Sequence, residues 1–117
     1  MTALHLPTAV AALSALAHGH RLSVFRLLVR AGGQGVPAGA IAREVGVLPN
    51  TLSTHLTILG HAGLVTSRRE GRSVIYSADY AAMRGLLSFL VADCCAGRPE
   101  ICDALGDAAC AAQERQT

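Results

Sequence analysis

The segment Pro49–Tyr76 constrains the fold more than any other part of the chain. Apolar residues recur at intervals of four and three positions in its first half, which predicts an amphipathic helix over Pro49–Ala62. Gly63 then provides a typical helix stop. The residues that follow alternate in polarity and predict two strands, Leu64–Arg69 and Ser73–Ser77, joined by a turn. The segment therefore predicts a helix followed by a β-ribbon.

Helices are predicted on both sides of this segment. A short helix over Pro37–Val45 precedes it and, with the helix at 49–62, predicts a helix-turn-helix. Two earlier helices are expected over Thr8–His18 and Arg21–Ala31, and a long one over Tyr80–Cys94. The candidate N-caps are Thr8 for the first helix and Asp79 for the last. The pattern predicts a mainly α (α+β) fold, a winged helix-turn-helix of about five helices with a two-stranded β-wing.

The length of 117 residues predicts a single domain. We expect residues 1–95 to form the DNA-binding and dimerisation domain and residues 96–117 to form a cysteine-containing tail. Aromatic residues make up only 3% of a chain that is 51% hydrophobic, which favours helix packing and a helical dimer interface over a base-stacking platform. No catalytic motif is found, so neither an enzyme nor an organic cofactor is expected.

The first predicted helix is the one stretch that resembles a targeting signal. Thr8–Ala17 is apolar, but no Lys or Arg precedes it, so a helix of the domain is the favoured interpretation. No apolar run reaches the roughly 18–20 residues that a membrane helix needs. We therefore expect a cytoplasmic protein without a membrane partner, in which the cysteines are reduced.

The polar face of the helix at 49–62 is the first candidate site. It carries no charged residue, whereas a merely solvated helix face usually carries Lys, Glu or Asp. Short hydroxyl and amide side chains can approach base edges and phosphates in a major groove. His55 is expected either to touch a phosphate or to brace the helix. The other candidates for DNA contact on this helix are Asn50, Thr51, Ser53, Thr54 and Thr57.

The predicted ribbon carries the second candidate site, formed by Arg68, Arg69 and Arg72. All ten cationic residues of the chain are Arg, whose planar guanidinium suits phosphate contacts. An ordinary solvated turn is the alternative, but adjacency to the polar helix favours a wing that contacts the same double-stranded DNA.

Four cysteines within seventeen residues form the third candidate site: Cys94, Cys95, Cys102 and Cys110. Thiolates that converge on one centre suit a soft, thiophilic ion. As(III) or Sb(III) takes three sulfur ligands in a pyramid, whereas zinc wants a fourth ligand, for which Cys110, Asp93 or Asp103 are candidates. The alternative is redox sensing, in which Cys94 and Cys102 form a disulfide.

Five histidines are present, without HxxxH or HExxH spacing. Each is expected to be a surface or capping residue, and the sequence predicts no histidine-rich metal site.

Several motifs together resemble the ArsR/SmtB family of metalloregulatory winged-helix repressors. They are Ala17–Leu22, Leu27-Leu28, Ile41-Ala42, Leu52–Leu56 with Leu59 and Ala62–Val65, and Arg69–Arg72 with Tyr76. The resemblance extends over about Leu13–Leu90, and Ser-x-His-Leu-x-x-Leu-x-x-Ala-Gly-Leu-Val is its most specific part.

The resemblance implies a homodimer formed by the first and last helices. The residues expected at that interface are Val10, Leu13, Leu16, Met83, Leu86, Leu87 and Leu90. It also implies repression of a resistance operon through operator DNA, which is released when a metal binds.

Among the family's sensor sites, the match is to the subgroup that has a Cys-Cys pair and a third Cys after the last helix, here Cys94, Cys95 and Cys102. That subgroup resembles As(III) sensors, with As(III) as inducer at one three-cysteine site per subunit, and with Sb(III) as a second candidate ligand. The role of Cys110, which lies outside the pattern, stays open. The alternative expectation is a winged-helix repressor that senses thiol redox state, Cd(II) or Pb(II).

Overall fold

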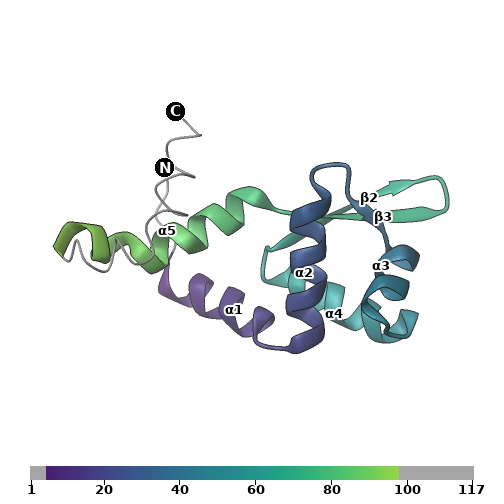
Figure 1. The fold of residues 1–117 in the computed structure, drawn as a ribbon, viewed down its shortest axis with the longest axis horizontal. Helices are drawn as coiled ribbons and strands as arrows, with labels where there is room; N and C mark the ends of the chain where they lie inside the picture. Colours follow the sequence, from purple (N-terminus) through teal and green to yellow (C-terminus); the bar gives the residue numbers. More distant parts are fainter. Residues whose placement is uncertain (1–4, 98–117) are drawn as a thin grey trace.

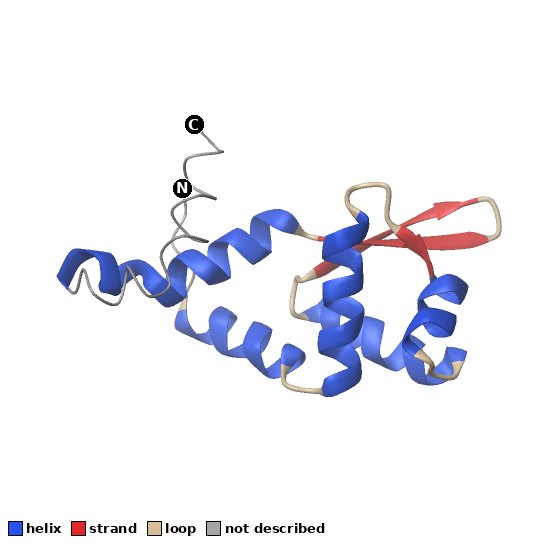
Figure 2. Ribbon diagram, viewed as in Figure 1, coloured by secondary structure: helices blue, strands red, loops and turns tan. Residues whose placement is uncertain are grey.

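The computed structural model describes residues 5–97, and it contains five helices and three strands (Figures 1 and 2). The helices are α1 (Leu6–Leu16), α2 (Gly19–Ala31), α3 (Ala38–Val45), α4 (Pro49–His61) and α5 (Tyr80–Gly97). The strands are β1 (Val36–Pro37), β2 (Val65–Glu70) and β3 (Ser73–Ala78). The winged helix-turn-helix prediction is confirmed in its fold class and in its element order.

The sheet has one strand more than the sequence predicted. Its order is β1-β3-β2, all antiparallel, with Val36 opposite Tyr76 and Pro37 opposite Ile75. The two residues of β1 are too few to show an alternating pattern. Pro37 has no N–H to donate, and it lies on an edge strand, where that loss is tolerated.

Most helix limits are close to those predicted, but two helices begin earlier. The N-cap position of α1 is His5, so Thr8 lies inside the helix and its prediction as a cap was wrong. Helix α2 begins at Gly19 rather than Arg21. Asp79 does cap α5, because its Oδ1 accepts the N–H of Ala82 at 3.0 Å. Helix α5 continues to Gly97, three residues beyond the predicted end.

Helix α4 ends as the sequence predicted. Gly63 has a φ of 79°, in the left-handed region that favours glycine. The N–H of Leu64 donates to the carbonyl of Leu59 at 3.0 Å, and the N–H of Gly63 donates to the carbonyl of Gly60 at 3.0 Å. These two bonds are a Schellman motif, which directs the chain from α4 straight into β2.

The core lies between α2, α3, α4 and the sheet. Its largest fully buried side chains are Val24, Leu28, Ile41, Leu52, Leu59 and Leu64. The fully buried residues of α1 are all alanines, Ala9, Ala12 and Ala15, and Leu16 packs half-buried against the core. Helices α1 and α5 lie side by side at the end of the molecule opposite the wing (Figure 1). Among the described residues, no helix has the length and apolar character needed to cross a bilayer.

Candidate nucleic-acid interface

The helix-turn-helix consists of α3 and α4, which pack against each other. Leu52, Leu56 and Leu59 hold the inner face of α4 in the core. The opposite face is exposed, and all five hydroxyl and amide residues predicted to contact DNA lie on it: Asn50, Thr51, Ser53, Thr54 and Thr57. The structure thus places these five side chains where a ligand outside the domain can reach them.

The polar groups of this face keep hydrogen-bonding capacity for a ligand. Thr57 Oγ1 donates to the carbonyl of Ser53 at 2.9 Å, and Thr54 Oγ1 donates to that of Asn50 at 3.4 Å. Each hydroxyl retains acceptor lone pairs, and its proton can rotate toward another partner. Asn50 Oδ1 accepts the N–H of Thr51 at 3.0 Å, so the amide NH₂ of Asn50 remains a donor.

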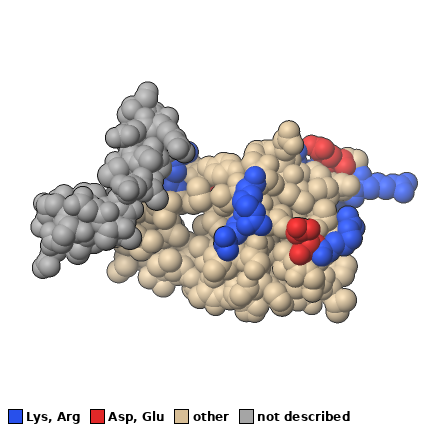
Figure 3. All heavy atoms as spheres, in the orientation of Figure 1, with Lys and Arg blue, Asp and Glu red and all other residues tan. Residues whose placement is uncertain are grey.

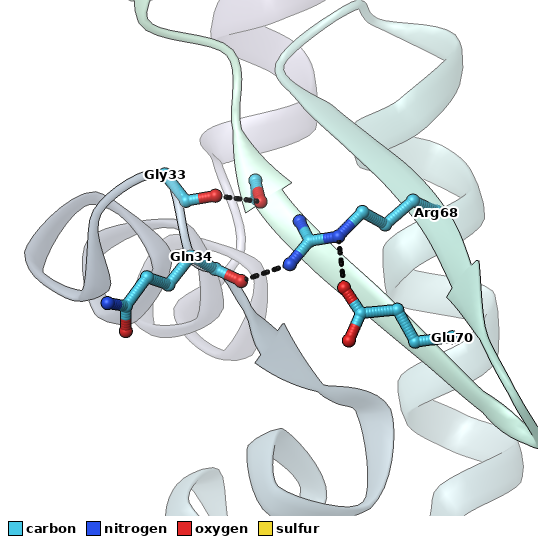
Figure 4. Close-up of polar contacts among 5 residues, drawn as sticks. Gly33, Gln34, Arg68 and Glu70 are labelled. Atoms are coloured by element: carbon cyan, nitrogen blue, oxygen red, sulfur yellow. Dashed lines mark hydrogen bonds and ion pairs between the residues drawn. The ribbon is translucent and has the colours of Figure 1, made fainter.

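The three arginines of the wing are not equivalent. Arg68 Nε donates to Glu70 Oε2 at 2.7 Å, and its Nη2 donates to the carbonyl of Gln34 at 2.7 Å (Figure 4). Arg68 therefore ties β2 to the loop between α2 and β1, and its charge is matched by a carboxylate. This arrangement disfavours the prediction that Arg68 serves as a free phosphate-binding group.

Arg69 and Arg72 are exposed, and neither forms an ion pair within the part of the chain that the structure describes. Arg69 lies opposite Val74, on the face of β2 away from Arg68. Arg72 follows Gly71, whose φ of 63° makes the tight turn at the tip. Figure 3 shows cationic side chains extending from the wing end of the molecule, with acidic atoms beside them.

A shallow hollow lies between α4 and the wing. Its volume is about 240 Å³, and its lining residues are Leu56, Thr57, Gly60, His61, Val65, Thr66, Ser67 and Tyr76. The lining includes Thr57 from the exposed face of α4.

His55 does not share the exposed face of α4. Only 7% of its surface is exposed, so the direct phosphate contact predicted for it is disfavoured and the bracing alternative fits. Its ring lies 4.7 Å from that of His18 and 5.8 Å from that of His20, measured between centroids. Burial lowers the pKa of His55, and the charges of His18, Arg21 and His20 act in the same direction.

This histidine cluster is a grouping that the sequence analysis missed. His18 is the N-cap residue of α2, where its Nδ1 accepts the N–H of His20 at 3.2 Å, as the predicted capping role requires. No short spacing pattern reveals the cluster, because the fold brings position 55 to positions 18 and 20. To predict the cluster from the sequence, one would have to know that α2 packs against α4.

The residues predicted for the dimer interface divide into two groups. Val10, Leu13, Leu87 and Leu90 are 42–55% exposed, and Leu16 and Met83 are half-buried. Leu86 is only 6% exposed and belongs to the core of the protomer, so it is not available to a partner. Adjacent positions on α5 point in different directions, which separates Leu86 from Leu87.

The predicted cysteine site falls largely outside the described residues. The backbone of Cys94 and Cys95 lies in the last turns of α5. Cys102 and Cys110 lie beyond residue 97, outside the part of the chain that the structure describes.

Comparison with known proteins identifies a matching family model and several similar proteins. The family model described as a helix-turn-helix domain matches residues 16–68, from the end of α1 into β2. The HTH-type transcriptional regulator YgaV of Escherichia coli is 30% identical over 82 residues, which are 70% of this chain and 81% of YgaV. The nodulation protein NolR of Rhizobium meliloti is 35% identical over 78 residues, which are 67% of this chain and 62% of NolR.

A solved structure from Mycobacterium bovis extends the comparison to three dimensions. It is a homodimeric winged helix-turn-helix DNA-binding domain of a possible ArsR-family transcriptional regulator. It is 35% identical to this chain, covers 76% of it and 82% of its own length, and has a TM-score of 0.59. With the exposed face of α4 and the wing in place, these matches show that the chain belongs to the ArsR-type winged helix-turn-helix transcriptional regulators.

Proposed function

We propose that the protein is an arsenic-responsive repressor that binds operator DNA as a homodimer. Release follows when As(III), or Sb(III), binds a site of three cysteines, Cys94, Cys95 and Cys102, in each subunit. The observation that carries the DNA-binding part is the exposed, uncharged face of α4 together with the wing, where Arg69 and Arg72 form no ion pair with any described residue.

Operator binding follows from the dimensions of these elements. A major groove is about 12 Å wide and admits one helix, and short polar side chains are the groups that approach its floor closely. The wing then reaches the flanking backbone, where Arg69 and Arg72 contact phosphates. In a twofold-symmetric dimer, two such units read half-sites about one turn apart, roughly 34 Å.

The apolar surface at the far end of the protomer supports the homodimer. Seven large apolar side chains of the described residues are exposed, and five of them lie on α1 and α5: Leu6, Val10, Leu13, Leu87 and Leu90. Helix α1 buries three alanines and exposes Leu6, Val10 and Leu13, whereas a monomeric helix would be expected to bury its larger apolar residues. A twofold axis at this surface covers the same patch on both subunits.

The chemistry of the donor set supports a trivalent metalloid. Three thiolates satisfy As(III) in a pyramid without a fourth ligand. Neighbouring positions of a regular helix are about 100° apart, and α5 continues through Cys94 and Cys95. Capture of one ion by both thiolates therefore requires the last turn of α5 to unwind, and this is the structural change that we assign to the inducer.

A chain of packed helices can pass this change to the DNA-reading face. Helix α5 contacts α1, and α1 contacts α4. Emptying an operator from 99:1 to 1:99 needs about 5.5 kcal/mol of differential binding. Because the coupling from one site is typically about 1–3 kcal/mol, we propose that both sites of the dimer are filled before release.

The decisive experiment measures operator occupancy during parallel titrations with arsenite, antimonite, Cd(II), Pb(II) and peroxide. Release by arsenite at stoichiometric amounts, without release by peroxide, is the expected result. Release by peroxide that a reductant reverses would instead establish a thiol-redox repressor, and preferential release by Cd(II) or Pb(II) would establish a sensor of divalent ions. Either result would overturn the arsenic assignment while leaving operator binding intact.

A further inference from the structure

Three histidines, two from the start of α2 and one from α4, converge beneath the DNA-reading helix. His18 and His20 come from the start of α2, and His55 comes from the inner face of α4. The three rings are mutually in contact, with centroid separations between 4.7 and 5.8 Å. One nitrogen from each ring lies within 4.8 Å of the other two. Within the described residues, this is the one group of three candidate ligand side chains that lie so close together.

The buried member of the cluster is His55, which is only 7% exposed. Its Nδ1 has no hydrogen-bond partner among residues 5–97. Leaving a buried polar atom unpaired costs free energy, so such an atom in a native protein calls for an explanation. The other two rings are exposed, which gives an ion access to the cluster from solvent.

We propose that His18, His20 and His55 form a binding site for a first-row divalent cation of the zinc type, separate from the cysteines. Imidazole nitrogen is a ligand that Zn(II), Co(II) and Ni(II) favour. Three histidines with a water molecule in the fourth position are an established tetrahedral arrangement for zinc. This proposal is independent of the arsenic site and of the operator.

The three histidine nitrogens need to move only slightly closer together to bind one ion. A zinc–nitrogen bond of about 2.0–2.1 Å places tetrahedral nitrogens roughly 3.4 Å apart, compared with the limit of 4.8 Å in the structure. Rotation of the two exposed rings about their side-chain torsions can supply this difference. A neutral imidazole has one ligating lone pair, and in His18 that lone pair accepts the N–H of His20. Metal binding therefore competes with the cap of α2.

A cationic side chain, Arg21, lies close enough to the cluster to interact with His55. Arg21 opposes an added cation, but its Nε donates to the carbonyl of Ala15 at 2.6 Å, which holds the guanidinium on the α1 side. The ion would join α4 to the start of α2, and the inner side of the reading helix would then be tied to the α1–α2 unit.

The test uses the full chain with all four cysteines replaced by serine, because thiolates would otherwise compete for the probe ion. Co(II) is titrated into this parent, and its visible d–d bands report coordination. We expect one Co(II) per protomer, without sulfur-to-metal charge transfer, and displacement of Co(II) by Zn(II). Zn(II) should also raise the thermal midpoint of the parent, because it binds only the folded cluster.

Single substitutions then assign the ligands. His20→Gln removes an exposed side chain that makes no side-chain hydrogen bond in the described structure, and it should weaken Co(II) binding by at least about tenfold. His61→Gln, on α4 but outside the cluster, should leave the affinity unchanged. The proposal is overturned if the parent binds no Co(II), or if His20→Gln binds it as the parent does. Because His55→Gln could impair folding, His20→Gln is the decisive variant.

Discussion

Arg68 and Glu70 form an ion pair on one face of β2, with Nε 2.7 Å from Oε2, and the same guanidinium also donates to the carbonyl of Gln34 (Figure 4). The two side chains are 45% and 58% exposed, so the pair contributes at most about 1 kcal/mol to stability. The larger consequence of this ion pair is for the charge of the wing. The carboxylate matches the charge of Arg68, whereas Arg69 and Arg72 form no ion pair within the described part of the chain.

Replacement of Arg72 by Ala should weaken DNA binding on every sequence. Loss of one phosphate contact reduces the slope of log affinity against log salt by about 1. Arg68→Ala should change the slope less, because Glu70 already neutralises that charge. Fluorescence anisotropy at several salt concentrations measures both slopes, and an unchanged slope for Arg72→Ala would remove the wing tip from the interface.

Gly35→Ala should destabilise the fold. Gly35 has a φ of +77°, and a Cβ there would lie 2.6 Å from the carbonyl oxygen of Tyr76 and 2.6 Å from Ser77 Oγ. The substitution should lower the free energy of unfolding by about 2 kcal/mol or more. Each kcal/mol lowers the thermal midpoint by roughly 4–8 °C in a domain of this size.

The matched control for this substitution is Gly33→Ala, two residues earlier in the same loop. A Cβ at Gly33 would meet no atom of residues 5–97 within 4 Å, and Gly33 is not among the glycines with a positive φ. Thermal unfolding should give a lower midpoint for Gly35→Ala than for Gly33→Ala. Equal midpoints would show that the β1–β3 pairing does not constrain residue 35.

Leu87→Glu should prevent dimer formation while the protomer stays folded. Leu87 is 53% exposed on α5, the helix that packs against α1, so a charge there would be solvated in the monomer and buried in the proposed dimer. Leu22→Glu is the control, since Leu22 is also exposed, at 44%, but lies on α2. Sedimentation equilibrium should show a monomer for Leu87→Glu and a dimer for Leu22→Glu. A dimer in both would place the interface elsewhere.

The stability of the protein should fall as the pH drops below about 6.5, the ordinary pKa of histidine. Burial, followed by the charges of His18, Arg21 and His20, lowers the pKa of His55 in the folded state. The unfolded chain therefore takes up a proton at a higher pH than the folded protein does. The contribution of His55 is complete above the unfolded pKa, and it is lost as the pH falls toward the folded value.

Urea unfolding at several pH values, with a chelator present, measures this dependence. His55→Gln should have a shallower decline in unfolding free energy between pH 7.5 and pH 5.5 than the parent, in the window set by the ordinary pKa of about 6.5. His61→Gln should keep the slope of the parent, because His61 is exposed. A parallel decline for His55→Gln and the parent would assign the acid sensitivity to other groups.

Local sequence patterns predicted the elements well because the signals lie within a few residues of each other. The apolar period of α4 and the glycine at position 63 suffice to place the reading helix and its end, and the Schellman bonds show why. Strand β1 was not predicted, because its two residues, one of them Pro37, are too few to show an alternating pattern. They become part of the sheet only by pairing with β3.

The roles of individual side chains were harder to predict, since they depend on contacts between distant positions. The loop partner of Arg68 is Gln34, 34 residues away in sequence, so the local pattern could not predict that this arginine bonds to the loop between α2 and β1. His55 follows two exposed polar residues in sequence, yet the angle of 100° per residue turns it toward His18 on α2.

The role of Cys102 distinguishes metalloid sensing from the other proposals for the tail. Cys102→Ser should bind operator with the affinity of the parent, because the reading face and the wing are unchanged. It should no longer release DNA with arsenite, since two thiolates leave the As(III) pyramid incomplete. Cys110→Ser is the control and should release normally, because Cys110 is not needed for a three-sulfur site. Normal release by Cys102→Ser would show that Cys102 is not an essential ligand, and loss of release in Cys110→Ser alone would move the third thiolate to Cys110.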